Sequence, residues 1–272
     1  MDNSFLKEKA LTFRKDIITM LHACNSGHPG GSLSCVEIIT ALYYSNMKVD
    51  PKNPKWDDRD RFVLSKGHAA PTLYAVLADL GFFPKADLIN LRRIDSHLQG
   101  HPDMKKTPGV DMCTGSLGQG VSTAVGIALA GKTRKKDFKV YALLGDGELQ
   151  EGLVWEASMA AAHYKLDNLT IIIDNNGLQI DGSNDEVMGL GDISAKFEAF
   201  GFKTILVNGH DFDEINAALK IEVKGKPKCI IAKTHKGRGI SFMEDNFAWH
   251  GKGISDNDFK AAMAELEVKH NV

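Results

Sequence analysis

An acidic residue between two glycines ends an apolar run in the stretch LLGDG, residues 143–147. Gly145 and Gly147 would let a ligand come close to the backbone, and a helix expected to begin near Glu151 would direct free N–H groups at an anion. A carboxylate next to an anion site needs a bridging cation. Proteins commonly hold Mg²⁺ with one or two oxygen ligands together with the phosphates of a substrate. Asp146 is therefore predicted to bind a metal; the alternative is a glycine turn with an acidic cap.

A second oxygen ligand is expected at the end of the next apolar run, where the sequence reads DNN at residues 174–176. Asn176 lies 30 positions after Asp146, a distance that suits a strand, a crossover helix and a second strand. In an open sheet of parallel strands, ligands bind outside the carboxyl ends of the strands. Asp174, Asn175 and Asn176 are therefore all candidates for the second ligand. Ca²⁺ or Mn²⁺ would also suit oxygen ligands.

Histidines form the other chemically suggestive group. The chain has ten, and five of them lie beside glycine: His28, His68, His101, His210 and His250. All but His210 are candidates for a functional role. Imidazole accepts and donates protons near neutral pH, which suits acid–base chemistry. His97 and His101 are four residues apart, but no Cys or acid nearby completes a zinc site. Lys236 and Arg238, in the stretch HKGRG, lie either on the ligand side or in a solvated loop.

The segments that must position these residues alternate between strand-like and helix-like patterns. Several strand-like segments are continuous apolar runs, which is typical of parallel strands covered on both faces. We predict an α/β fold with an open, mostly parallel sheet and helices on both faces, formed by residues 1–272 as one domain. The predicted strands are residues 61–65, 138–145, 169–174, 202–208 and 228–234. The predicted helices are residues 5–24, 32–44, 67–81, 117–132, 151–164 and 212–223. The helix at 117–132 is rich in small residues and should pack very closely on the sheet.

Seven motifs occur in the order in which they occur in transketolases: GHPGGSLS, LSKGHAAPTLYA, GHPD, TGSLGQG, GDGELQEGLVWEA, DNNGLQIDG and FMEDNFAWHGK. The Gly-Asp-Gly stretch followed later by Asn also resembles the thiamine diphosphate motif. The resemblance covers the chain from about residue 5 to residue 255. It implies the thiamine diphosphate-binding fold, in the form of the domain that holds the diphosphate.

The resemblance also implies roles for individual residues. A metal would be held by Asp146, Asn176 and the backbone carbonyl of Leu178. Thiamine diphosphate would contact a larger set: His68, Gly115, Ser116, Leu117, Gly147, Glu148, Asn176, Leu178, Ile180 and His250. Within that set, Gly147 and Glu148 would lie against the diphosphate through the backbone. Residues 115–117 would line the aminopyrimidine with main-chain groups. Leu178 and Ile180 would press on the cofactor rings or simply pack in the core.

Four residues are expected to be catalytic on the same resemblance. His28, His101 and His250 would contact the sugar hydroxyls and shuttle protons. Glu151, with Glu156, resembles the family's buried acids at the subunit contact; Glu151 could also simply favour a helix N-terminus.

The implied activity is that of a transketolase, in which a two-carbon glycolaldehyde unit passes from a ketose phosphate to an aldose phosphate. The cofactors would be thiamine diphosphate and Mg²⁺, and the pathway the pentose phosphate pathway. Transketolases are much longer, and their pyrimidine-binding domain, C-terminal domain and sugar-phosphate arginines lie outside this sequence. We therefore expect the N-terminal subunit of a two-chain enzyme, active only with a separate C-terminal transketolase subunit, in a heterotetramer.

Other functions compete with this interpretation. The nearest alternative is a subunit of another thiamine diphosphate enzyme, either similar to deoxyxylulose-phosphate synthase or a transketolase for unusual sugars. A nicotinamide oxidoreductase is disfavoured, because no GxGxxG closes a first strand with an acid about twenty residues further on. A non-catalytic binding module left from a truncated gene is disfavoured by the intact metal pair and histidines; it would gain support if the chain bound no second subunit.

The composition narrows the functional classes. The net charge of -2 gives no basic footprint for nucleic acid. No apolar run is long enough to cross a bilayer, and the charged N-terminus MDNSFLKEKALTFRKDII has no signal-peptide core. Four cysteines without a CxxC pair indicate free thiols in a reducing compartment: Cys24, Cys35, Cys113 and Cys229. A cytoplasmic enzyme acting on small molecules is expected.

Overall fold

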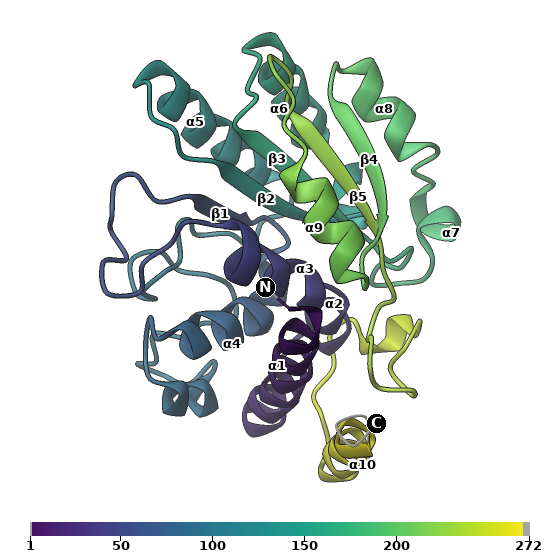
Figure 1. Cartoon of the computed structure of the whole chain (residues 1–272). Coiled ribbons are helices and arrows are strands. Elements are labelled where there is room, and N and C mark those ends of the chain that lie inside the picture. Colours follow the sequence, from purple (N-terminus) through teal and green to yellow (C-terminus); the bar gives the residue numbers. More distant parts are fainter. Residues whose placement is uncertain (1, 269–272) are drawn as a thin grey trace.

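Five parallel strands form the sheet of the structure, a computed structural model that describes residues 2–268 (Figure 1). The strand order is β1-β2-β3-β5-β4. The strands are β1 (Arg61–Leu64), β2 (Val140–Gly145), β3 (Leu169–Asn175), β4 (Lys203–Asn208) and β5 (Lys228–Lys233). The central strands β2 and β3 are buried along almost their whole length, as apolar strands covered on both faces must be. The predicted α/β class with an open parallel sheet is confirmed.

Helices cover both faces of this sheet, so that alternate strand residues enter two different apolar cores. Leu143 and Ile172 belong to the first core, whereas Leu144 and Ile173 belong to the second. The helices of the first core are α1 (Asn3–Cys24), α2 (Pro29–Ser34), α3 (Val36–Ala41), α4 (Ala70–Leu80) and α9 (Phe212–Lys220). The helices of the second are α5 (Gln119–Thr133), α6 (Gly152–His163) and α8 (Ile193–Ala199). None of the described helices is both long and apolar enough to span a bilayer.

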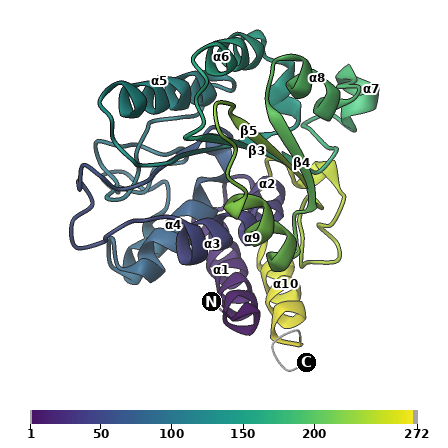
Figure 2. The ribbon, with the colours of Figure 1, turned by 45° about the horizontal axis from the view of Figure 1, so that its top comes forward.

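Two further α-helices are α7 and α10. The short helix α7 (Asn184–Met188) follows β3. The helix α10 (Asp256–Val268) lies along α1, near the opposite end of the sequence, and its Ala262 and Leu266 belong to the first core (Figure 2). We did not predict α7, α8 or α10. α7 has five residues and α8 has seven, so their apolar pattern is too short to show a helical period.

One predicted helix, at residues 32–44, differs in its start and its continuity. α2 begins earlier, at Pro29, because proline has no N–H to lose in the first turn of a helix. Cys35 then separates α2 from α3, and a π-helical turn (Leu42–Asn46) completes the segment.

The register of the sheet brings the loops with the predicted metal ligands to one edge. Gly145 of β2 lies opposite Asp174 of β3. The amide of Asp146 donates to the Asp174 carbonyl at 3.3 Å, and the amide of Thr234 donates to the Asn175 carbonyl at 3.2 Å. The loops that follow β2, β3 and β5 therefore begin side by side.

The helix α5 packs very closely on β1, as its small residues predicted. A β-carbon added at Gly120 would lie 2.6 Å from the hydroxyl oxygen of Ser65 and 2.7 Å from its α-carbon. A β-carbon at Gly131 would lie 2.8 Å from the ring of Phe138. These two positions have no space for a side chain.

Gly120→Ala should lower the free energy of unfolding by about 1–3 kcal/mol, because the added methyl group meets the end of β1 and forces a shift of the backbone. Gly126→Ala, on the same helix, is the matched control, because nothing lies within 4 Å of its added carbon. This control should be neutral or stabilise the protein by up to about 1 kcal/mol. Urea unfolding measures both values, and equal effects would contradict the close contact between α5 and β1.

Candidate active site

A cavity of about 220 Å³ lies at the carboxyl edge of the sheet and brings together most of the predicted site residues. Those that line it are His28, His68, His101, Gly115, Leu117, Asp146, Gly147, Glu148, Asn176, Leu178, Ile180 and His250. Ser116 and Glu151 are not among the lining residues, and Glu151 is exposed just before α6. The role of Glu151 at a subunit contact stays a prediction.

Asp146 follows β2 with its side chain almost fully buried, since only 2 % of the residue is exposed. One carboxylate oxygen accepts a hydrogen bond of 2.8 Å from the amide of Gly147, and the other accepts one from the amide of Gly177. Burial raises the pKa of this carboxyl group, and the nearby charge of Asp174 raises it further. No Lys or Arg of the described residues forms an ion pair with Asp146. A buried carboxylate without a cationic partner is suited to a metal ion.

The loop after β3 is held against Asp146 and presents two more oxygen atoms. Gly177 has a φ of +79°, a left-handed conformation that lets the loop turn so that its amide reaches Asp146. Asn176 is buried, and its side-chain oxygen accepts a hydrogen bond of 3.1 Å from the amide of Leu178. The Leu178 carbonyl accepts one of 3.0 Å from Lys236. A carboxylate, an amide oxygen and a carbonyl form a hard donor set of the kind that Mg²⁺ prefers.

Four imidazole rings surround the cavity. The ring centroids are 5.2 Å apart for His28 and His68, 5.5 Å for His28 and His250, and 6.3 Å for His28 and His101. Burial lowers the pKa of all four, and neighbouring positive groups lower it further, to about 4 at His28 and about 3 at His250. All four rings are therefore neutral at pH 7. The buried Nδ1 of His28 has no hydrogen-bond partner in the described chain, which leaves it available to a ligand.

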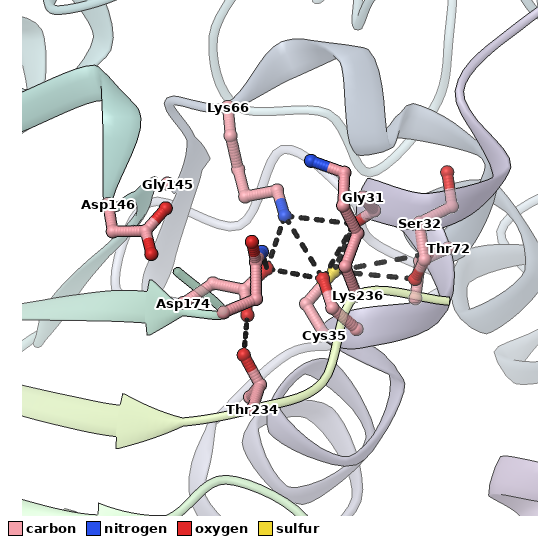
Figure 3. Close-up of polar contacts among 12 residues, drawn as sticks. Gly31, Ser32, Cys35, Lys66, Thr72, Gly145, Asp146, Asp174, Thr234 and Lys236 are labelled. Carbon is pink, nitrogen blue, oxygen red and sulfur yellow. Dashed lines mark hydrogen bonds and ion pairs between the residues drawn. The ribbon is translucent and has the colours of Figure 1, made fainter. Parts of the chain in front are cut away.

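An ion pair joins Lys66, which lines the cavity, to Asp174 behind it, with 1 % and 0 % of the two side chains exposed (Figure 3). Lys66 also donates to the carbonyl of Gly31 at 2.8 Å, while the hydroxyls of Ser34 and Thr234 donate to Asp174. Burial opposes both charges, but their mutual attraction outweighs it, so the pKa of Asp174 is lowered and that of Lys66 is raised. The charge of Asp174 is already balanced by Lys66, whereas Asp146 has no such partner, which argues against Asp174 as the metal ligand.

Glu148 organises the cavity wall through its side chain as well as lining it. One of its oxygens accepts hydrogen bonds from the hydroxyl of Ser65 and, at 2.8 Å, from the amide of Gly118. The other accepts one of 3.1 Å from the amide of Gly145. Burial raises the pKa of this carboxyl group. Glu148 thus ties the segment after β1 and the start of α5 to the end of β2.

Lys66 and Lys236 also line the cavity, and we did not predict either as a site residue. Lys236 is only 2 % exposed, so the alternative of a solvated loop is wrong for this side chain. Its ammonium lies 3.0 Å from both the Leu178 carbonyl and Nδ1 of His250. Burial, followed by the charge of Lys66, lowers its pKa to about 8. A buried ammonium without a carboxylate partner fits an anionic ligand. The available signals were SKGH and HKGRG, where each lysine precedes a glycine.

Two other histidines lie outside the cavity and have partners of their own. His97, considered above with His101 as a zinc pair, lies 3.0 Å from the carboxylate of Asp87. His210 lies 3.0 Å from the carboxylate of Glu37. Neither of the two lines the cavity.

Comparisons with known proteins point to one family. The family described as "Transketolase, thiamine diphosphate binding domain" matches residues 7–271. The "6-deoxy-6-sulfo-D-fructose transketolase subunit SqwG" of Clostridium sp. (strain MSTE9) is 45% identical over 264 residues, which is 96% of this chain and 96% of that protein. The transketolase of Mus musculus is 47% identical over 268 residues, which is 96% of this chain but 42% of that protein. The crystal structure of transketolase from Campylobacter jejuni superimposes with a TM-score of 0.92 at 39% identity, over 98% of this chain and 43% of that chain. The chain thus spans less than half the length of these two transketolases.

Removing one member of the Lys66–Asp174 pair should leave the other charge buried and unpaired. Lys66→Met and Asp174→Asn should each lower the free energy of unfolding by about 3–5 kcal/mol, and the double variant should lose clearly less than the sum. Urea unfolding of the three variants measures this coupling. If the two effects simply added, the charges would not depend on each other and our view of the pair would be wrong.

His28 gives the protein a pH-dependent stability. Its pKa of about 4 in the folded protein lies below the ordinary value of 6.5, so the unfolded chain takes up the proton first as the pH falls. The contribution of His28 to the free energy of unfolding is therefore complete above pH 6.5 and is lost progressively between pH 6.5 and pH 4. His28→Gln should reduce the slope of the free energy of unfolding against pH in this range, by up to about one proton. Urea unfolding at several pH values measures this slope.

His163→Gln is the control for that series, because His163 is exposed at the end of α6. An identical pH dependence in His28→Gln and the unsubstituted protein would show that His28 is not held in its neutral form by burial.

Proposed function

The chain belongs to the transketolase family, whose thiamine diphosphate-binding domain it contains, and we propose that it is the N-terminal subunit of a two-chain transketolase. In the proposed reaction, a two-carbon glycolaldehyde unit passes from a ketose phosphate to an aldose phosphate. The observation that carries the proposal is the cavity, where neutral imidazoles, a buried carboxylate without a cation and a buried ammonium meet. The relative SqwG, named as a subunit, supports it because the match extends over 96% of both chains.

The oxygen donors of the cavity fit a divalent metal ion. Asp146, the side-chain oxygen of Asn176 and the carbonyl of Leu178 would hold Mg²⁺, and Ca²⁺ or Mn²⁺ would suit the same atoms. The Leu178 carbonyl has a second lone pair besides the one that accepts from Lys236. The metal would balance the buried charge of Asp146 and join it to a diphosphate.

The other wall of the cavity fits the diphosphate. Lys236 makes two hydrogen bonds within the described chain and has three ammonium protons, so one remains for an anion. His68 and His250 lie beside it with ring centroids 5.2 Å apart. Gly147 and Glu148 would approach the diphosphate through the backbone. The negative charge of this ligand would also offset the positive charge of Lys236, since Lys66 is already paired with Asp174.

The rings of the cofactor would lie against small and apolar residues. Gly115, with Ser116 and Leu117, would present main-chain groups to the aminopyrimidine. A β-carbon at Gly115 would lie 3.2 Å from the ring of His101, and its φ of +151° also favours glycine. Ile180 is 63% exposed, which argues against core packing and leaves its side chain available for a cofactor ring, together with Leu178.

Bound thiamine diphosphate supplies a nucleophilic carbon and an electron sink for breaking a C–C bond beside a carbonyl. The residues of this chain would orient the sugar and move its protons. His28, His101 and His250 are neutral at pH 7, so each ring can accept a proton from a sugar hydroxyl and return it later.

The rest of the active site would come from a separate C-terminal subunit that holds the pyrimidine. We propose a heterotetramer with two copies of each chain. Glu151 and Glu156 are exposed in this chain and would become buried only on association. Met159, on the same helix α6, is 59% exposed and adds apolar area to that surface.

A second candidate function is transfer from a sulfonated ketose instead of a phosphorylated one. The similarity to SqwG favours it, because that protein is named for 6-deoxy-6-sulfo-D-fructose and the match covers 96% of both chains. The residues of this chain that would contact the cofactor are the same for both substrates. The alternative of a deoxyxylulose-phosphate synthase has no counterpart among the relatives compared above.

The chain purified with its second subunit, thiamine diphosphate and Mg²⁺ should convert xylulose 5-phosphate and ribose 5-phosphate into sedoheptulose 7-phosphate. Asp146→Asn should lower turnover by at least about 100-fold, because even changes behind the ligands of a metal cost 10- to 100-fold. Asp137→Asn is the control, since Asp137 is exposed before β2, at the opposite edge of the sheet. Native mass spectrometry of the same sample should show the second chain.

Turnover of 6-deoxy-6-sulfo-D-fructose but not of xylulose 5-phosphate would favour the second candidate. If a complex with bound cofactor transferred no two-carbon unit from either donor, the proposed function would be wrong.

A further inference from the structure

Arg92 lies between the two loops that carry His28 and His101. Its Nη1 donates to the hydroxyl of Ser26, two residues before His28, at 3.3 Å. A β-carbon added at Gly100, the residue before His101, would lie only 2.7 Å from Cζ of Arg92. The guanidinium therefore contacts both loops immediately next to their histidines.

The backbone of Arg92 is fixed in a conformation that residues with side chains rarely adopt. Its φ is +61°, in the left-handed region that is costly for any residue except glycine. The preceding Leu91 is only 1% exposed, and the amide of Arg92 donates to the carbonyl of Leu98 at 2.8 Å. The fold thus holds this backbone in place, and the long side chain extends from a rigid base.

Arg92 lies close to the glycine that precedes each of the two histidines. At Gly100 an added side chain would push the guanidinium or the loop away, because all three nearest atoms belong to Arg92. At Gly27 an added β-carbon would lie at ordinary contact distance from Arg92, 3.8 Å from Nε, and it is Leu21, at 2.5 Å, that leaves no space there. A planar group with five donors can lie against two backbones and still donate to Ser26, which a lysine ammonium cannot reproduce.

The charge of Arg92 also acts on the two histidines. No acid of the described residues forms an ion pair with Arg92. After burial, Arg92 is the strongest influence that lowers the pKa of both His28 and His101. The other titratable groups that face these two rings are His68, His250, Lys66 and Lys236.

We propose that Arg92 is a positioning residue whose guanidinium sets the separation of the His28 and His101 loops at the edge of the cavity. The ring centroids of these histidines are 6.3 Å apart, a separation that one sugar could span with its hydroxyls. This inference rests on the proposed function, because Arg92 acts on the reaction only through the two histidines.

Three variants, tested in the two-chain complex, distinguish the effect of the shape of the Arg92 guanidinium from the effect of its charge. Arg92→Lys keeps the positive charge but loses the planar contact, whereas Arg92→Met loses both. Arg93→Met is the matched control, because the neighbouring Arg93 is exposed and its side chain makes none of these contacts. NMR titration of the ¹⁵N-labelled histidine rings measures the pKa of His28 and of His101 without any substrate. Steady-state kinetics with the ketose donor then measures KM, which depends on the separation of the two loops.

Arg92→Met should raise the pKa of both His28 and His101, and Arg92→Lys should raise them less. Both variants should increase KM for the donor by roughly ten-fold, because small displacements of positioning groups are costly, and Arg93→Met should change neither quantity. Unchanged titrations in Arg92→Met, or an Arg92→Lys enzyme with the KM of the Arg93→Met control, would overturn the inference. Shifted titrations in a complex that turns over no sugar would instead contradict the proposed function, so the two failures are distinguishable.

Discussion

The buried ion pair between Lys66 and Asp174 is the interaction on which the arrangement of the cavity depends. Lys66 follows β1 and Asp174 lies near the end of β3, while the carbonyl of Gly31 in α2 and the hydroxyl of Thr234 after β5 complete their hydrogen bonds. Neither charge is tolerable alone without water, and together they are satisfied only when all four segments meet. The walls of the cavity are therefore positioned by a contact that lies just behind them.

The cavity in front of this pair contains charges that only a ligand can balance. Asp146 is a buried carboxylate without a cation, and Lys236 is a buried ammonium without a carboxylate. The four neutral imidazoles between them add donors and acceptors but no charge. The metal ion and diphosphate proposed above would supply the cation at one wall and the anion at the other. In that proposal, Gly145 and Gly147 would leave room for a ligand to come within bonding distance of Asp146.

The parts of the site that could be predicted from the sequence are those with a local signal. Asp146, Asn176 and the four histidines lie beside glycines or directly after apolar strands, so their positions follow from the order of the elements. Lys66 could not be assigned in this way, because the Asp174 that holds it lies 108 positions away. The short helices α7 and α8 have too few residues for a period, and α10 packs on α1 from the other end of the sequence. The predicted role of Glu151 at a subunit contact would involve the surface of another chain, so the fold of this chain does not test it.

The anomalous scattering of Mn²⁺ is the measurement that tests the metal–diphosphate site most directly. Crystals of the chain with its second subunit, thiamine diphosphate and Mn²⁺ in place of Mg²⁺ should give one anomalous peak in the cavity. The peak should lie at about 2.1 Å, as hard divalent ions do, from the carboxylate of Asp146, the side-chain oxygen of Asn176 and the carbonyl of Leu178. A peak ligated by Asp174, or cofactor density without a peak at Asp146, would contradict the account.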